Sequence, residues 1–127
     1  MVKIKMLGVL FLCHLSLSTQ AAINNNQECY VFINSSVPEQ LDLFVRFNEE
    51  YYLSSTLQRN TKIIFINISN QLMVNHYIVP VINDTQGIWV RKFKPQMLPT
   101  VFSIHRHKSL QRVISTTAEI RQCLQGK

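Results

Sequence analysis

The sequence has no apolar run long enough to cross a membrane, no internal repeat and no low-complexity segment. Its longest apolar stretch, residues 6–17, is interrupted by Cys13, His14 and Ser16. A membrane-spanning helix needs about 20 apolar residues. These absences exclude a transmembrane helix of ordinary length and an architecture built from repeats.

The first residues have the pattern of a secretory signal peptide. Lys3 and Lys5 precede the apolar stretch, and small residues lead to an expected cleavage after Ala21. Acylation of Cys13 in a lipoprotein is a weaker alternative, because no small residue stands just before this cysteine. We therefore predict a signal peptide at residues 1–21 and one exported domain at residues 22–127, which is too short for two cores.

Acidic residues are scarce, with 7 against 13 lysines and arginines. One stretch contains six cations and no acid: Arg91, Lys92, Lys94, Arg106, Lys108 and Arg112. Such a stretch is either a solvated surface or a docking surface for an acidic partner protein or anionic headgroups. No nucleic acid partner is expected, because no aromatic platform lies between the charges.

Cysteine is also scarce, and only Cys29 and Cys123 remain after removal of the predicted signal peptide. In an oxidising compartment this pair could close most of the domain into one loop, which is worth about 4–5 kcal/mol. The bond requires Cα atoms within about 7 Å. The alternative is two unpaired cysteines that are buried or lie near the chain ends, and the sequence leaves both open.

Apolar runs of β-branched and aromatic residues predict four strands, at residues 29–33, 62–67, 100–105 and 110–114. Helical spacing predicts three helices: one from a Ser36–Glu39 capping box, a short one between Ser69 and Pro80, and one from Thr116 or Thr117 to Gly126. The first two strands should be parallel, and the last two antiparallel. Residues 54–60 are expected to form a polar connection, and residues 81–89 turns with little regular structure.

Leu98-Pro99-Thr100 lies at the start of the third predicted strand. Proline has no amide donor and a fixed φ, so it suits the first residues of a strand, and it favours an extended Leu98. X-Pro-Thr before a strand resembles the cis-proline loop of thioredoxin-like domains. Since only about 5–6% of X-Pro bonds are cis, the isomer stays open.

The predicted order of elements resembles the thioredoxin fold. This resemblance implies a three-layer α/β fold with the order β-α-β-α-loop-β-β-α and a central mixed four-stranded sheet. Thioredoxin-like enzymes carry Cys-x-x-Cys after the first strand, where a helix N-terminus lowers the thiol pKa. Residues 34–38 contain no cysteine, and Cys29 lies at the other end of the strand. We therefore expect a protein that is not an enzyme.

Two motifs resemble the TrbC family of F-type conjugative pilus assembly proteins. Residues 31–38 are similar to that family's apolar strand and Ser-x-Ser-Met-Pro turn, with Asn34 and Val37 as departures. Residues 90–93 followed by residues 98–100 are similar to its Phe-Arg-Arg-Phe-Gly segment leading into Val-Pro. Lys94 replaces the expected glycine, and residues 67–68 replace an Arg-Gly pair.

The resemblance implies a non-enzymatic periplasmic assembly protein of a conjugative type IV secretion apparatus, with no membrane span after cleavage and partners such as TraW. The residues expected to contact the partner are Arg91, Lys92, Phe93, Lys94, Leu98, Pro99, Thr100, Ser35 and Ser36. The alternatives are a divergent periplasmic thiol-disulfide oxidoreductase and a secreted thioredoxin-like binding module.

No other constellation predicts chemistry, and we expect no cofactor and no metal. His105 and His107 would share a strand face but have no acidic or thiolate companion. A Ser35 or Ser36 nucleophile would need a base that the sequence does not place nearby. Three matches to the glycosylation sequon, at Asn34, Asn67 and Asn83, are attributed to chance in an Asn-rich chain.

Overall fold

The computed structural model describes residues 27–59 and 62–126. The predicted signal peptide lies outside these ranges. The elements, in chain order, are β1 (Glu28–Ile33), α1 (Pro38–Leu53), α2 (Ser55–Arg59), β2 (Lys62–Asn67), β3 (Val81–Asn83), α3 (Ile88–Phe93), β4 (Thr100–His105), β5 (Lys108–Val113) and α4 (Thr117–Leu124).

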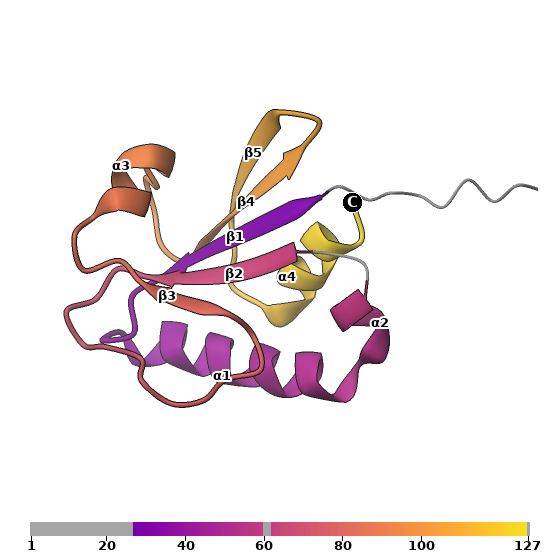
Figure 1. Cartoon of the computed structure of the whole chain (residues 1–127), viewed down its shortest axis with the longest axis horizontal. Helices are drawn as coiled ribbons and strands as arrows, with labels where there is room; N and C mark the ends of the chain where they lie inside the picture. Colours follow the sequence, from indigo (N-terminus) through magenta and orange to yellow (C-terminus); the bar gives the residue numbers. More distant parts are fainter. Residues whose placement is uncertain (1–26, 60–61, 127) are drawn as a thin grey trace, which may run out of the picture.

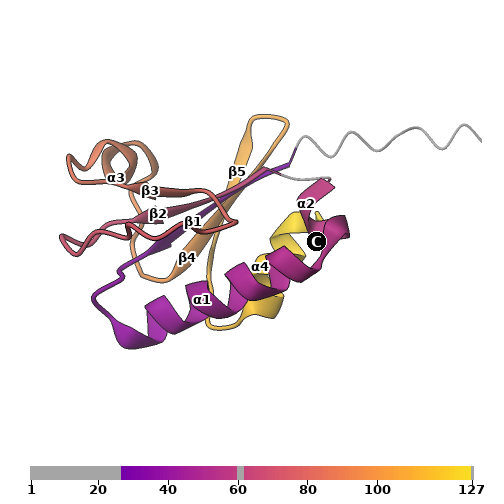
Figure 2. The same cartoon turned by 60° about the horizontal axis from the view of Figure 1, so that its bottom comes forward.

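The strands form one mixed sheet in the order β3-β2-β1-β4-β5 (Figure 1). β1 pairs in parallel with β2, and β2 with β3, whereas β4 runs antiparallel to both β1 and β5. Helices α1 and α4 cover one face and α3 lies on the other (Figure 2). The predicted three-layer α/β fold and the predicted strand directions are therefore confirmed.

Two apolar clusters lie on opposite faces of β1. The larger one joins the sheet to α1 and α4 and includes Phe44, Phe47 and Phe65. The smaller one lies under α3 and includes Phe32 and Phe102. Because side chains alternate along a strand, β1 supplies both clusters, and its last five residues are buried.

The sheet has five strands, so the prediction of four was wrong. The additional strand, β3, is only three residues long and pairs with the last half of β2. Asn83, Asp84 and Gly87 predict turns at residues 81–89, and this prediction was wrong for β3 and α3. The carboxylate of Asp84 instead accepts hydrogen bonds from the amides of Trp89 and Val90, and so pairs two amides in the first turn of α3 that have no partner within the helix.

The helix predicted between Ser69 and Pro80 does not form, and this segment is a loop. The Asn83 side chain accepts from the Met73 amide and donates to the Met73 carbonyl. Side chains therefore satisfy backbone groups that a helix would have paired. The expected polar connection at 54–60 contains the short helix α2 instead.

The Ser36–Glu39 capping box was also predicted wrongly. α1 begins at Pro38, and its N-cap, Val37, makes no side-chain capping bond. The Ser36 hydroxyl donates to the side chain of Asn34 instead. The turn before α1 is thus closed by Asn34.

Candidate functional site

The carboxyl ends of β1 and β2 meet the start of β4 at one end of the sheet. Thr100 pairs with Phe32, so the chain before Thr100 runs past the end of β1. The Ile68 amide donates to the Ile33 carbonyl, which holds the loop after β2 against the turn after β1. We call the residues at this end the strand-end surface: Asn34, Ser36, Ile68, Ser69, Asn70, Gln71 and Leu98.

The strand-end surface contains an open hollow of about 430 Å³. Its lining comes from the turn after β1 and the loop after β2. Besides Ile68, the five lining residues carry hydroxyl or amide side chains: Asn34, Ser36, Ser69, Asn70 and Gln71. None of the six is charged. The hollow thus offers both hydrogen-bond donors and acceptors to a ligand.

The two loops that line the hollow are tied together by Asn67, whose side chain is completely buried. Its oxygen accepts from the amides of Ser35 and Ser69, at 3.1 Å each. Its nitrogen donates to the Gln71 carbonyl at 2.9 Å and to the Asn83 side chain at 3.1 Å. Asn67 therefore holds the two loops of the strand-end surface together from a buried position beneath them.

The two predicted serines have different roles. Ser35 is only 6% exposed, and its hydroxyl donates to the Gln71 carbonyl at 2.7 Å. Ser36 is exposed and lines the hollow. Since the Ser35 hydroxyl is buried and committed to a backbone carbonyl, of the two serines only Ser36 is placed to contact a partner.

Leu98, whose side chain packs against the same apolar cluster as Ile68 of the hollow, has unpaired backbone groups. Within the described chain, neither its N–H nor its C=O makes a hydrogen bond, while the Pro99 carbonyl accepts from Ile114. The Leu98 side chain packs on the cluster under α3, and the Leu98–Pro99 bond is cis. Thr100 is fully buried and its hydroxyl donates to the Arg112 carbonyl, so Thr100 supports the loop from inside.

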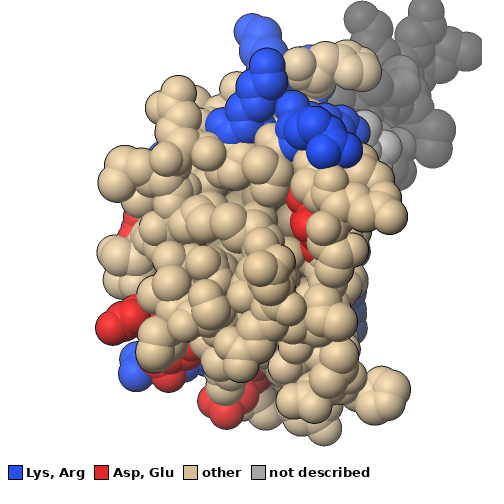
Figure 3. All heavy atoms as spheres, turned by 90° about the vertical axis from the view of Figure 1, so that its left-hand side faces the viewer, with Lys and Arg blue, Asp and Glu red and all other residues tan. Residues whose placement is uncertain are grey.

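α3 places its predicted contact residues on different sides. Phe93 points into the sheet, with ring centroids 5.0 Å from Tyr30 and 5.1 Å from Phe102. The Lys92 ammonium lies 5.5 Å from the Trp89 ring centroid, a cation–π contact. Arg91 is exposed and donates to the Gln86 carbonyl. Lys and Arg gather at the top of Figure 3, the side on which α3 and the β4–β5 hairpin lie in Figure 1.

Lys94 ends α3 in the left-handed conformation, with φ 51° and ψ 59°. This is the position at which the resemblance expected glycine, and the backbone conformation explains that expectation. Lys94→Gly should raise the free energy of unfolding by up to about 1 kcal/mol, because a left-handed side chain costs roughly 1–2 kcal/mol and glycine gives back part of that in entropy.

Urea denaturation measures this difference, and Lys92→Gly is the matched control. Lys92 lies inside α3, so its replacement should lower the stability by about 1 kcal/mol. A loss of stability in Lys94→Gly would contradict the described backbone.

Tyr30 lies under α3 and donates a hydrogen bond to the Glu28 carboxylate. Burial first, then the hydrogen bond and the charge of Glu28, raise the pKa of Tyr30 to about 12. Because an unfolded tyrosine ionises near pH 10, the unfolded chain loses this proton first. The free energy of unfolding should therefore fall as the pH rises from about 10 to about 12.

Tyr30→Phe should remove this part of the alkaline loss, as measured by urea denaturation at a series of pH values. Tyr52→Phe is the control, because Tyr52 is 64% exposed. An absorbance titration in which Tyr30 ionises near pH 10 would contradict the prediction.

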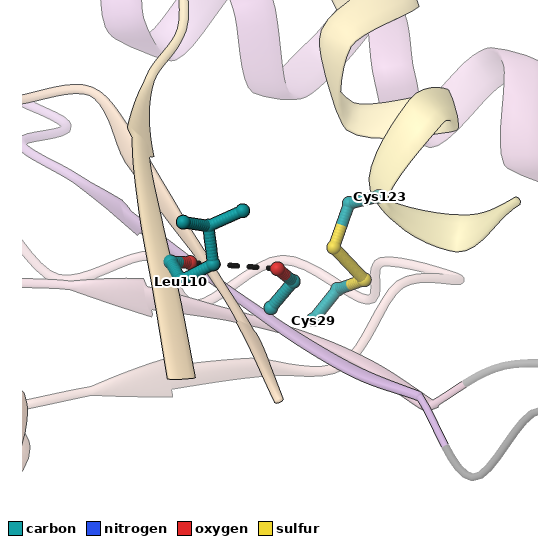
Figure 4. The surroundings of a disulfide bond; sticks show 4 residues. Cys29, Leu110 and Cys123 are labelled. Atoms are coloured by element: carbon teal, nitrogen blue, oxygen red, sulfur yellow. Dashed lines mark hydrogen bonds between the residues drawn. A yellow bond between two sulfur atoms is a disulfide. The ribbon is translucent and has the colours of Figure 1, made fainter. Parts of the chain in front are cut away.

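The cysteines lie away from the strand-end surface. Cys29 is at the start of β1, the end opposite that surface, and Cys123 is in α4. Cys29 and Cys123 form a disulfide that joins the start of β1 to α4, with Cα atoms 6.3 Å apart (Figure 4). Of the two arrangements that the sequence left open, the structure has the paired one. Cys29 is 1% and Cys123 5% exposed. Cys123 borders a small hollow of about 20 Å³ between β4, β5 and α4.

The described residues hold no group of three or more His, Cys, Asp or Glu side chains that could bind a metal ion. The prediction that His105 and His107 share a strand face was wrong. β4 ends at His105, and Arg106 and His107 form a two-residue turn with φ of 48° and 67°. No helix among these residues is long and apolar enough to cross a membrane.

Comparison with known proteins identifies the fold. No protein-family profile and no curated protein matches the chain. Among solved structures, StoA from Bacillus subtilis is similar with a TM-score of 0.58 and 15% identity, over 78% of this chain and 82% of StoA. The pneumococcal exposed lipoprotein thioredoxin Etrx1, from Streptococcus pneumoniae, is similar with a TM-score of 0.61 and 12% identity, over 82% of this chain and 87% of Etrx1.

Trxlp from Edwardsiella tarda is also similar, with a TM-score of 0.50 and 11% identity over 79% of this chain and 82% of that one. The chain therefore has a thioredoxin-like fold. Sequence identities of 11–15% show the fold alone.

The comparison contradicts the prediction that the protein is not an enzyme. The fold of this chain is shared with Etrx1, which is an exposed lipoprotein thioredoxin, so the fold is not that of non-enzymatic proteins alone. The prediction rests on the absence of cysteine at residues 34–38. That inference was too strong, because it considered only one position of the cysteine pair and the protein carries a disulfide elsewhere.

Proposed function

We propose that the protein is exported and binds an extended segment of a partner polypeptide at the strand-end surface. The observation that carries this proposal is the pair of unpaired backbone groups of Leu98 at the same end of the sheet as a polar hollow, with Leu98 and Ile68 of the hollow packed on one apolar cluster. An extended peptide can pair with such groups as an added strand, and its side chains can occupy the adjoining hollow. The predicted export and the likeness to an exposed lipoprotein thioredoxin support this location.

The cations of α3 extend this surface. Arg91 and Lys92 are exposed on α3, and Lys94 follows them. Such charges raise the association rate of an acidic partner and favour it over a basic one. Changing all three to glutamate should therefore slow binding, and added salt, which slows binding of the wild type, should no longer do so because it then screens a repulsion.

The finer form of this proposal takes the partner from a conjugative apparatus in the periplasm. Its support is the similarity of residues 31–38, 90–93 and 98–100 to the TrbC motifs. In this form the bound polypeptide belongs to a TraW-like assembly protein, and Ser36, Leu98 and Pro99 contact it.

A second candidate is thiol-disulfide exchange through Cys29 and Cys123. It is favoured by the likeness to thioredoxins and by the position of Cys123 at the border of a surface hollow. A substrate dithiol would attack the disulfide through its thiolate. The substrate would leave as a disulfide, oxidised by two electrons, and the Cys29–Cys123 bond would break, with one proton taken up by each sulfur.

The test is co-purification from the cell envelope with Asn70→Trp, which fills the hollow from an exposed position. The same change at Leu53, which is 81% exposed at the end of α1, is the control. We expect Asn70→Trp to lose at least about 90% of a captured protein that wild type and Leu53→Trp retain, since blocking the hollow costs more than about 1.4 kcal/mol.

Capture that is equal in all three proteins would contradict polypeptide binding at this surface. Identification of the captured protein as a secretion component would support the finer proposal. Cys29→Ser distinguishes the second candidate, because the thiolate of its free Cys123 would attack substrates in their disulfide form, release one substrate thiol and keep the other substrate sulfur as a mixed disulfide, which a reductant cleaves.

A further inference from the structure

β5 is an edge strand whose outer edge pairs with no other strand of the described chain, although its Arg112 donates a hydrogen bond to Gln122 of α4. It is six residues long and ends the sheet, whereas the opposite edge strand, β3, has three residues. Figure 1 shows the β4–β5 hairpin projecting beyond the helices. An uncovered edge of this length offers a row of backbone groups to an added strand.

The register identifies which backbone groups face outward. The Ile114 amide donates to the Pro99 carbonyl, which marks residues 99 and 114 as a hydrogen-bonded pair. Because bonded and non-bonded pairs alternate in an antiparallel ladder, Leu110 and Arg112 also bond to β4. The N–H and C=O groups of Ser109, Gln111 and Val113 therefore point away from the sheet.

The side chains along this edge follow a cation–apolar–cation pattern. Lys108, Leu110 and Arg112 lie on one face of β5, opposite His105, Ser103 and Val101 of β4. All three are exposed, and Leu110 is 62% exposed. Among the described residues, none of the salt bridges involves Lys108 or Arg112. Both cations are thus without an acidic partner.

This pattern argues against a second copy of the chain as the occupant. Antiparallel pairing of two β5 strands about Leu110 would place each Lys108 opposite Arg112 of the other copy. Parallel pairing in register would place each cation opposite itself. Like charges directly opposite one another destabilise a sheet. The same cations that prevent self-pairing favour a strand with acids at both positions.

We propose that β5 binds an extended acidic segment of a partner protein, which adds to the sheet as a sixth strand. The segment carries an apolar residue opposite Leu110 and acidic residues two positions before and after it, opposite Lys108 and Arg112. Its backbone pairs with Ser109, Gln111 and Val113. This site is separate from the strand-end surface and does not depend on the function proposed there.

A synthetic peptide, Thr-Glu-Thr-Leu-Thr-Glu-Thr, is the probe, with a copy in which lysine replaces both glutamates as the control. Fluorescence anisotropy measures its binding to the full-length chain at low and high salt. We expect the acidic peptide to bind, the basic one not to bind, and affinity to fall as salt rises. Lys108→Glu with Arg112→Glu should weaken binding by about tenfold or more.

Gln111→Pro tests the backbone pairing separately from the charge. It removes an outward N–H and leaves the bonds between β5 and β4 in place, since Gln111 does not bond to β4. We expect this variant to unfold like wild type and to lose the peptide, while Gln111→Thr binds it. Asn70→Trp should also bind it normally.

No binding of the acidic peptide, equal binding by the charge-reversed protein, or binding that Asn70→Trp removes would overturn the proposal.

Discussion

Replacing Cys29 and Cys123 together by alanine should lower the free energy of unfolding by about 4–5 kcal/mol. The bond closes a loop between residues 94 positions apart, and the chain-entropy model assigns about 4.7 kcal/mol to a loop of about 100 residues. A small domain has only about 5–15 kcal/mol of stability. The variant should therefore be close to unfolding at 37 °C.

The physical reason is the position of the bond. It fastens α4 to the first residues of β1, the central strand, so the last helix and the middle of the sheet cannot separate while it is intact. Without it, α4 is held by Ile120 and Leu124 in the larger apolar cluster and by the contacts of Arg121 and Thr117 with Glu50.

Urea denaturation of the oxidised wild type, the reduced wild type and the double variant measures the effect. Reduced wild type should match the variant, and Cys29→Ala alone should match the double variant, because either change breaks the bond. If all forms unfold at the same urea concentration, the disulfide does not stabilise the fold. It would then be more suited to the exchange chemistry of the second candidate function.

Asn67→Ala should lower the free energy of unfolding by about 2–6 kcal/mol. The Ser35 and Ser69 amides would each lose their acceptor in a buried position, at about 1–3 kcal/mol for each unpaired group. The Gln71 carbonyl keeps its bond from the Ser35 hydroxyl. The loss should therefore be centred on the two loops that line the hollow.

Asn70→Ala is the matched control, because Asn70 is exposed in the same loop and its replacement should change stability by at most about 0.5 kcal/mol. Urea denaturation gives the size of the effect. Amide hydrogen exchange locates it, since Ser35 and Ser69 should lose protection before the core strands. Unchanged stability and exchange would contradict the role of Asn67 as the link between the loops.

The sequence predicts the layers of this fold because local patterns determine them. The apolar runs at Cys29–Ile33 and Lys62–Asn67 are buried strands, and the pattern after Ser36 is a helix, as expected. The two-residue turn at Arg106 and His107 came close to the predicted position. Short elements were missed, because β3 and α3 depend on contacts rather than on propensity.

The strand-end surface was only partly predictable. Proline before β4 located Leu98, and the resemblance located Ser36. The sequence shows Asn67 only as part of a glycosylation sequon. Its role as a link between loops depends on four hydrogen bonds to three separate segments of the chain, which the sequence does not reveal. No sequence pattern of one chain reports hydrogen bonds between residues more than 30 positions apart, such as the bond from Ser35.

At Lys94 the sequence contained enough information to predict the end of α3. The resemblance expected glycine there, and a glycine expected at the end of a helix indicates a left-handed residue. This reasoning would have predicted the end of α3 and hence the helix itself.

The most direct test of the central proposal places a photo-crosslinking amino acid at Ser36 in the full-length protein, with the same amino acid at Leu53 as the control. If the strand-end surface binds a polypeptide, irradiation of intact cells should attach a defined protein at Ser36 and not at Leu53, and Asn70→Trp should abolish the product. No product at Ser36, or the same product at both positions, would contradict polypeptide binding at this surface.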